Sequence, residues 1–146
     1  MLQQQSKKGK STLHFMRGAL AFSVILSSPA FAFDCSWGGG TGDWFSANWS
    51  GCGGTSPSAI DDATISSGVV TLDDDQSVQT FTITGGNFSG TGTVTATDQV
   101  TFSTGIMSGE GTTRAEGGLL LNGGLSDIHA NRTLVNVSGQ TANWTE

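Results

Sequence analysis

The chain has 146 residues, enough for one domain, and carries six Lys and Arg residues against twelve Asp and Glu residues. A formal net charge of −6 repels nucleic acid and anionic membranes, so functions that depend on phosphate contacts are excluded. Although the chain is rich in Gly, Thr and Ser, periodic Val, Ile, Leu and Phe residues predict a folded protein and not a disordered one.

Residues 1–32 predict a secretory signal peptide. Four basic residues precede a short apolar run at 18–26, and Ala30-Phe31-Ala32 follows with the small-x-small pattern of a cleavage site. A membrane anchor is the alternative, but the run is about half the ~20 residues that span a bilayer. Cleavage after Ala32 leaves two arginines against twelve acidic residues, a formal charge of −10. We therefore expect a secreted or cell-surface protein without a transmembrane helix in its mature chain.

Residues 33–66 are expected to form an irregular N-terminal cap. Cys35 and Cys52 are the only cysteines, and in an exported chain they predict one disulfide. Its loop of about 17 residues gives a stabilisation of about 3 kcal/mol in the chain-entropy model. Free thiols are the alternative to this bond. A metal site at the two cysteines would lack further ligands.

Three of the four tryptophans, Trp37, Trp44 and Trp49, lie close together in this segment and are separated by glycines. One interpretation is that their rings cover the hydrophobic end of a first coil, as the atypical terminal elements of solenoids do. The other interpretation is a platform on which sugar rings stack, which would make the three tryptophans carbohydrate contacts.

Residues 67–146 predict β-solenoid coils with a period of about 19–20 residues. The segments that begin at Phe88 and Met107 match in chemistry when shifted by 19 residues. The matched pairs are Phe88 with Met107, Ala96 with Ala115, Val100 with Leu119, Phe102 with Leu121, and Gly105 with Gly124. Short alternating strands at a fixed period favour an all-β parallel β-helix of about four coils over an antiparallel sandwich.

Residues 141–146 read as the start of one more strand, with no polar cap after it. An open strand edge is an aggregation hazard. We therefore expect the sequence to be the N-terminal part of a longer chain, whose further solenoid coils are its partners. A docked partner or a dimer is the alternative cover for this edge.

The segment Trp37-Gly-Gly-Gly-Thr-Gly-Asp-Trp-Phe-Ser-Ala-Asn-Trp-Ser, with Ser56-Pro57 and Asp61-Asp62 after it, resembles the start of large bacterial exported repeat proteins. These are autotransporter-like and filamentous-haemagglutinin-like surface proteins. The resemblance covers about Trp37 to Trp144 and rests on the spacing of Gly, Thr and aromatic residues. It implies a right-handed parallel β-helix passenger or stalk at the outer membrane or outside the cell, often adhesive, without a shared catalytic motif.

Catalytic and metal-binding candidates are few. Asp73 and Asp75 flank Asp74 in an acidic turn that would suit calcium, since hard cations take several oxygen ligands; a solvated bend is the alternative. Asp61-Asp62 reads as a turn that enters a strand. His129 is the only histidine after the leader and has no acid or nucleophile near it in sequence. Arg114 and Glu116 lie two residues apart on one face of a strand and predict a surface ion pair.

These observations predict a non-enzymatic structural stalk or adhesin fragment, with no catalytic residues, no required cofactor and no nucleic-acid partner. The alternative is an extracellular carbohydrate-binding or polysaccharide-degrading module that uses the tryptophan-rich segment. A lyase or glycosidase on this fold would need paired carboxylates or a basic residue beside bound calcium. A glycan or a host cell-surface molecule is the expected external ligand.

Overall fold

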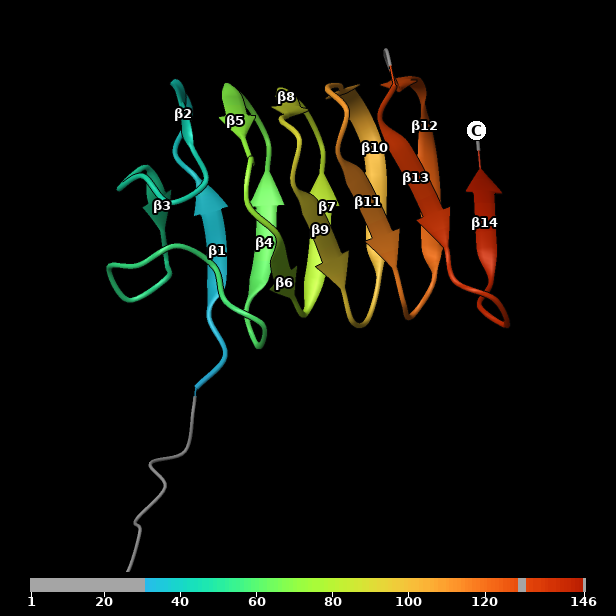
Figure 1. Cartoon of the computed structure of the whole chain (residues 1–146), viewed down its shortest axis with the longest axis horizontal. Helices are drawn as coiled ribbons and strands as arrows, with labels where there is room; N and C mark the ends of the chain where they lie inside the picture. The colour runs from blue at the N-terminus through green and yellow to red at the C-terminus, as the bar shows by residue number, and fades with distance from the viewer. Residues whose placement is uncertain (1–30, 129–130, 146) are drawn as a thin grey trace, which may run out of the picture.

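The computed structural model describes residues 31–128 and 131–145. These residues form fourteen β-strands and no helix, and they wind into a β-solenoid of about four turns. The coils follow one another along the long axis of the molecule, from β1 at one end to β14 at the other (Figure 1). The prediction of an all-β parallel β-helix is confirmed.

The strands of the coils lie on three faces, and the complete coils contribute to all three. One face contains β1 (Asp34–Trp37), β4 (Asp62–Ile65), β7 (Thr80–Ile83), the first parts of β10 (Val100–Met107) and β12 (Leu119–Ile128), and β14 (Ala142–Thr145). The second contains β2 (Thr41–Asp43), β5 (Val69–Thr71), β8 (Asn87–Ser89) and the later parts of β10 and β12. The third contains β6 (Gln76–Val78), β9 (Thr93–Ala96), β11 (Thr112–Ala115) and β13 (Thr133–Asn136).

The alternation of apolar and polar residues along each strand fixes which side chains enter the core. Because neighbouring strands pair in register, inward side chains form columns that run through the stack. One column on the first face consists of Ile65, Ile83, Phe102, Leu121 and Trp144. A polar column beside it consists of half-buried threonines: Thr64, Thr82 and Thr101. The core is therefore a continuous apolar rod inside a threonine-rich surface.

The predicted period matches the register between coils. Phe88 pairs with Met107, Ala96 with Ala115, Val100 with Leu119, and Phe102 with Leu121, as the self-match requires. The predicted equivalence of Gly105 and Gly124 is wrong, because Gly105 pairs with Ser126. Phe102 pairs with Leu121 whereas Thr104 pairs with Leu125, so β12 has two more residues than β10 at this bend. The insertion moves every later pair on this face.

Glycine is required where the chain turns closely over the preceding coil. Gly90 has φ of 111°, and a Cβ atom there would lie 2.1 Å from the carbonyl oxygen of Leu72. Gly109 stacks above it, and its Cβ would lie 2.4 Å from the carbonyl oxygen of Gly90. Since no L side chain fits this corner, the repeated Ser-Gly-x-Gly sequence is a requirement of the stacking.

The two ends of the stack differ. At the first end, β3 (Trp49–Ser50) pairs antiparallel with β1 and covers its edge. Of residues 33–66, expected to form a cap, β1, β2 and β4 lie within the parallel ladders, while β3 and the loop 51–61 lie beside them. At the other end, Trp144 lies in an inward column yet is 76% exposed. No later strand among the described residues pairs with β14.

We expect Phe81→Ala to lower the free energy of unfolding by about 3–5 kcal/mol, because it empties a fully buried position against Trp44 and Phe88. Urea denaturation followed by circular dichroism measures the loss. The control is Thr82→Ala, the next residue on the same strand, whose side chain faces outward. Losses of similar size at the two positions would contradict the assignment of inward and outward faces.

Candidate functional site

The tryptophan-rich end is built from β1, β2, β3 and the turn between β2 and β3. A turn begins at Asp43, whose carboxylate accepts the amide N–H of Phe45 at 2.8 Å and directs residue 44 into the solenoid. The Trp44 ring lies over Phe81 and Phe88, with ring centroids 6.0 and 6.2 Å away. It therefore fills the interior at the point where a preceding coil would otherwise stack.

The other two tryptophans pack against Trp44 or against each other. The Trp49 centroid lies 4.9 Å from that of Trp44 and 5.3 Å from that of Trp37, both in edge-to-face arrangements. The indole N–H of Trp49 donates to the backbone carbonyl of Trp44 at 2.7 Å. Such contacts stabilise aromatic pairs beyond the effect of burial alone. The three residues form one aromatic cluster on top of the first complete coil.

This placement bears on the two interpretations of the tryptophans. Trp37, Trp44 and Trp49 are exposed by only 2%, 0% and 7%, so none of them presents a ring face to solvent. A sugar-stacking platform needs an open aromatic face. The geometry therefore supports the interpretation in which the three rings cover the end of the hydrophobic column, and it does not support a platform made of these three residues.

Cys35 and Cys52 form a disulfide, with their Cα atoms 4.9 Å apart, as predicted. Cys35 lies in β1, whereas Cys52 lies in the loop that follows β3. The bond thus fastens the loop that covers the end to the first rung of the ladder. Both cysteines are buried within the core cluster. A disulfide indicates folding in an oxidising compartment.

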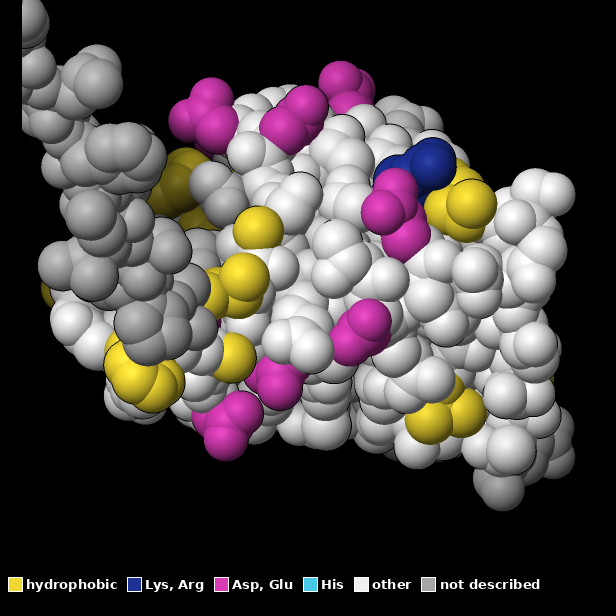
Figure 2. All heavy atoms as spheres, turned by 90° about the horizontal axis from the view of Figure 1, so that it is seen from below, with side chains coloured by type: hydrophobic (Ala, Val, Ile, Leu, Met, Phe, Trp, Pro, Cys, Tyr) yellow, Lys and Arg dark blue, Asp and Glu magenta, His cyan; other side chains and the backbone are white. Residues whose placement is uncertain are grey.

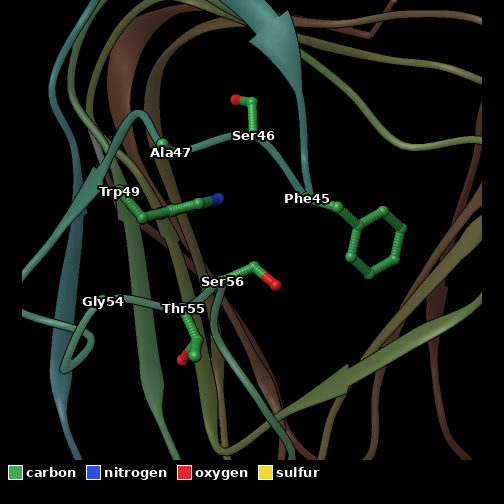
Figure 3. A pocket seen from close by; sticks show the side chains of 7 residues that line it. All are labelled: Phe45, Ser46, Ala47, Trp49, Gly54, Thr55 and Ser56. Atoms are coloured by element: carbon green, nitrogen blue, oxygen red, sulfur yellow. The ribbon is translucent and has the colours of Figure 1, made fainter.

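A shallow pocket of about 200 Å³ opens beside this cluster. Its lining residues come from the turn before β3 and from the loop after it: Phe45, Ser46, Ala47, Trp49, Gly54, Thr55 and Ser56. Figure 3 shows the edge of the Trp49 indole on one side and the Phe45 ring on the other. Phe45 is 47% exposed and is therefore the accessible aromatic ring among the residues that line the pocket. Unlike the three tryptophans, this phenylalanine was not among the site residues predicted from the sequence.

Asp61 is a buried carboxylate, 3% exposed, at the entrance to β4. One carboxylate oxygen accepts the backbone N–H of Phe33 at 2.8 Å, and the other accepts the amide and the hydroxyl of Ser58 at 2.8 and 2.6 Å. Burial alone would raise the pKa of this carboxyl, but the hydrogen bonds from Ser58 and Phe33 outweigh burial and hold the pKa below its ordinary value. The carboxylate is therefore ionised at neutral pH.

The acidic turn at residues 73–75 holds the next coil. One oxygen of Asp73 accepts the backbone N–H of Thr91 at 3.1 Å, and one oxygen of Asp75 accepts that of Thr93 at 2.8 Å. The two side chains thus bind amide groups one coil away. Across residues 31–128 and 131–145, no three His, Cys, Asp or Glu side chains lie close enough to hold a metal ion together. Calcium at Asp73 and Asp75 stays a prediction.

Arg132 is a buried cation near the other end of the stack, 5% exposed. Its guanidinium lies 4.2 Å above the Phe88 ring and donates to the backbone carbonyls of Gly90, Ser108 and Thr112 at 3.2–3.4 Å. Burial lowers the pKa of Arg132 to about 10. A Cβ atom at Gly111 would lie 2.8 Å from the guanidinium, so this glycine leaves room for it.

The burial of Arg132 was not predicted from the sequence. The signal was present in the repeat, because the backbone pairing of Thr112 with Thr133 places position 132 above the small residue Gly111. A long side chain that follows a column of glycines can bend inward and fill the space that they leave.

The remaining candidates lie on the surface or outside the described residues. Arg114 and Glu116 form the predicted ion pair at 3.0 Å, with both side chains about two-fifths exposed. In Figure 2 the basic side chain in view lies directly beside an acidic one, and other acidic side chains are scattered over this face, both at its margins and near its centre. Most of that face is uncharged. His129 lies outside the described residues.

Neither a protein-family model nor a curated protein nor a solved structure matches this chain. Within the part of the chain that the structure describes, no helix is long and apolar enough to cross a membrane. The solenoid fold itself is compatible with many activities, so the function has to be argued from the surfaces and ends of this molecule.

We expect replacement of both Cys35 and Cys52 by alanine to lower the free energy of unfolding by about 3 kcal/mol, as loop-closure entropy suggests for this loop length. Denaturation of the oxidised protein and of the double variant measures the difference. Reduction of the unaltered protein with a thiol reagent should have a similar effect. If the double variant were as stable as the oxidised protein, the loop would be held by the aromatic cluster alone.

Proposed function

We propose that this chain is a non-enzymatic, exported β-helix module that serves as a rigid stalk or adhesin fragment at the cell surface or in the medium. The observation that carries the proposal is the unbroken inward column that begins near Trp37 and reaches Trp144 through every described coil. A column of this kind gives a rod whose length depends only on the number of coils. Its outward side chains then provide the contact surface.

Export is supported by two independent features. The sequence of residues 1–32 has the order of a signal peptide, and Cys35 and Cys52 form a disulfide, which persists in oxidising compartments. The resemblance to bacterial exported repeat proteins agrees with this proposal. The exposure of Trp144 in an inward column favours extension of the stack by further coils of the same chain.

A second candidate function, glycan binding, rests on the pocket beside the aromatic cluster. The pocket combines an exposed aromatic ring, Phe45, with the hydroxyl groups of Thr55 and Ser56 (Figure 3). Carbohydrates are bound by this combination of an apolar ring face and nearby polar groups. In this form the alternative no longer depends on the ring faces of the three buried tryptophans.

The stalk function predicts that the solenoid lengthens when coils are added. Residues 81–99 form one coil in register, because Phe81 pairs with Val100. Four extra copies inserted after Gln99 should give a folded rod about 19 Å longer, at roughly 4.8 Å per coil. Each copy again presents Phe81 and Phe88, so the contacts of Trp44 and of Arg132 at the two ends are kept.

Small-angle X-ray scattering measures the maximum dimension, and circular dichroism confirms that the β-content is retained. The matched control carries insertions of the same length and composition in scrambled order, which break the inward columns. A lengthened chain that unfolds, or that expands like the scrambled control, would contradict the stalk function. A rod that grows in proportion to the number of copies supports it.

The glycan function predicts that Phe45→Ala weakens oligosaccharide binding about tenfold, which corresponds to about 1.4 kcal/mol. Trp49 lines the pocket and provides the fluorescence signal for the titration. Ile106→Ala is the matched control, because Ile106 is an exposed apolar residue on β10, outside the set that lines the pocket. If the unaltered chain binds no oligosaccharide on an array of bacterial and host glycans, this candidate is removed and the stalk function is unaffected.

A further inference from the structure

Among the described residues, Asp61 is the one buried carboxylate, and every group that donates a hydrogen bond to it is neutral. Its hydrogen bonds come from the amide of Phe33 and from the amide and hydroxyl of Ser58. The ion pair found among the described residues joins Arg114 to Glu116, several coils away. A buried anion that is held only by neutral donors is costly, and a cation beside it would remove part of that cost.

The backbone nitrogen of Phe33 donates to one carboxylate oxygen of Asp61 at 2.8 Å. Phe33 is the residue that follows the predicted cleavage site Ala30-Phe31-Ala32. Hydrolysis of the bond between Ala32 and Phe33 consumes one water molecule. The carboxylate stays on Ala32, and the nitrogen of Phe33 becomes an α-amine, which is protonated at neutral pH.

We propose that Asp61 is a built-in receptor for the α-ammonium group of Phe33 that this cleavage creates. The inference rests on the export proposed above. Processing replaces the neutral amide donor to the Asp61 carboxylate with a charged ammonium donor, which makes the hydrogen bond an ion pair as well. The new N-terminus is then fixed to the loop that covers the first coil, and removal of the leader locks this end of the solenoid.

The surrounding structure holds both partners in place. The carbonyl oxygen of Phe33 accepts the backbone N–H of Asp62 at 2.9 Å, so Phe33 is fastened beside the entrance to β4. Ser58 holds the second oxygen of Asp61 and thereby fixes the orientation of the carboxylate. Cys35 ties the chain two residues further on to Cys52. Both partners are therefore positioned before the charge is created.

The site also distinguishes between cleavage positions. Consecutive Cα atoms lie about 3.8 Å apart, so an α-amine one residue earlier or later would lie beyond hydrogen-bond distance of Asp61. The bond to be cut is accessible, because Phe31 and Ala32 are exposed. The other charged groups on the adjoining strands are Asp34 and Asp62, which carry the same sign as Asp61 and also favour the ammonium form.

The composition of the mature chain allows the α-amine of Phe33 to be modified selectively. All lysines precede residue 33, the chain contains no tyrosine, and both cysteines are in the disulfide. An amine-selective reagent therefore modifies the mature chain at the α-amine of Phe33 alone. Acetylation restores a neutral amide N–H at this nitrogen, which reproduces the donor that the precursor presents to the Asp61 carboxylate and requires no substitution.

The experiment starts from the full-length gene, expressed in a bacterium, and the exported product is sequenced from its N-terminus. We expect Phe33 as the first residue. With ¹⁵N-labelled phenylalanine, NMR then follows the α-amine across pH 6–11. We expect its pKa to lie at least one unit above the ordinary value of about 7.7–8.0. Asp61→Asn should bring the pKa back towards that value, whereas Asp62→Asn, the matched control, should leave most of the shift.

Stability gives a second measurement that does not depend on either variant. Because the pair raises the pKa of the amine in the folded state, its stabilisation is present below about pH 8 and is lost as the pH rises through the raised pKa. Between these limits the folding equilibrium constant of the free-amine protein should fall at least tenfold relative to that of the acetylated protein. Comparison of the two forms cancels the titration of every other group.

Each outcome decides one of the two proposals. If a folded, exported protein begins at another residue, or if Asp61→Asn and Asp62→Asn affect the amine equally, the receptor is refuted while export stands. If the full-length gene gives no exported product, the proposed function fails. The mature chain is then released in vitro from a fusion cut immediately before Phe33, and the same titration decides the role of Asp61 independently.

Discussion

The register between successive coils is the constraint on which the rest of this structure depends. A single coil has no core of its own, and its apolar side chains are buried only when they stack on equivalent side chains of the next coil. Parallel pairing allows this only at a fixed period, since a slip of one residue would turn every inward side chain outward. The matched pairs from Phe88 and Met107 to Phe102 and Leu121 show this period in the sequence and in the backbone pairing.

The two buried charges each bind groups from more than one coil. Asp61 joins the segment before β1 to the segment before β4, and Arg132 reaches backbone carbonyls as far back as Gly90. Burial of these charges costs free energy, which their hydrogen bonds offset only when the coils are in one particular register. The apolar columns alone would tolerate several similar registers in a chain of short repeats. Charges that are satisfied in one register therefore add specificity to packing that is otherwise repetitive.

The sequence was sufficient to predict the fold class, the period and the disulfide, because each depends on a local pattern. The glycine corners, the alternating strands and the two cysteines can all be identified without knowledge of distant contacts. The bend within β12 was not predictable, because two extra residues there leave the local alternation intact. The self-match continued through Gly124 for the same reason and gave the wrong partner for Gly105.

The candidate site was predictable only in part. The tryptophans stood out by type, but their burial depends on a turn at Asp43 that directs Trp44 inward and leaves Phe45 outside. The sequence shows two adjacent aromatic residues and does not show which of them enters the core. The role of Asp61 depends on Phe33, 28 residues earlier in the chain, so no local pattern could reveal it. The repeat of a solenoid does not specify the contacts at its ends and turns, so these contacts cannot be predicted from the repeat.

The same distinction indicates where a function can reside in this molecule. The interior is filled by columns that serve packing, and the turns at residues 73–75 bind the amides of the next coil. Asp73 and Asp75 are held by these hydrogen bonds, and the inward side chains are enclosed by packing, so neither set is free to act on a ligand. The accessible features are the threonine-rich faces, the pocket beside Phe45 and the exposed ring of Trp144. If this chain binds a glycan or a further coil, as proposed, the contact has to be made at its surface or at its ends, while the packed coils set the distance between them.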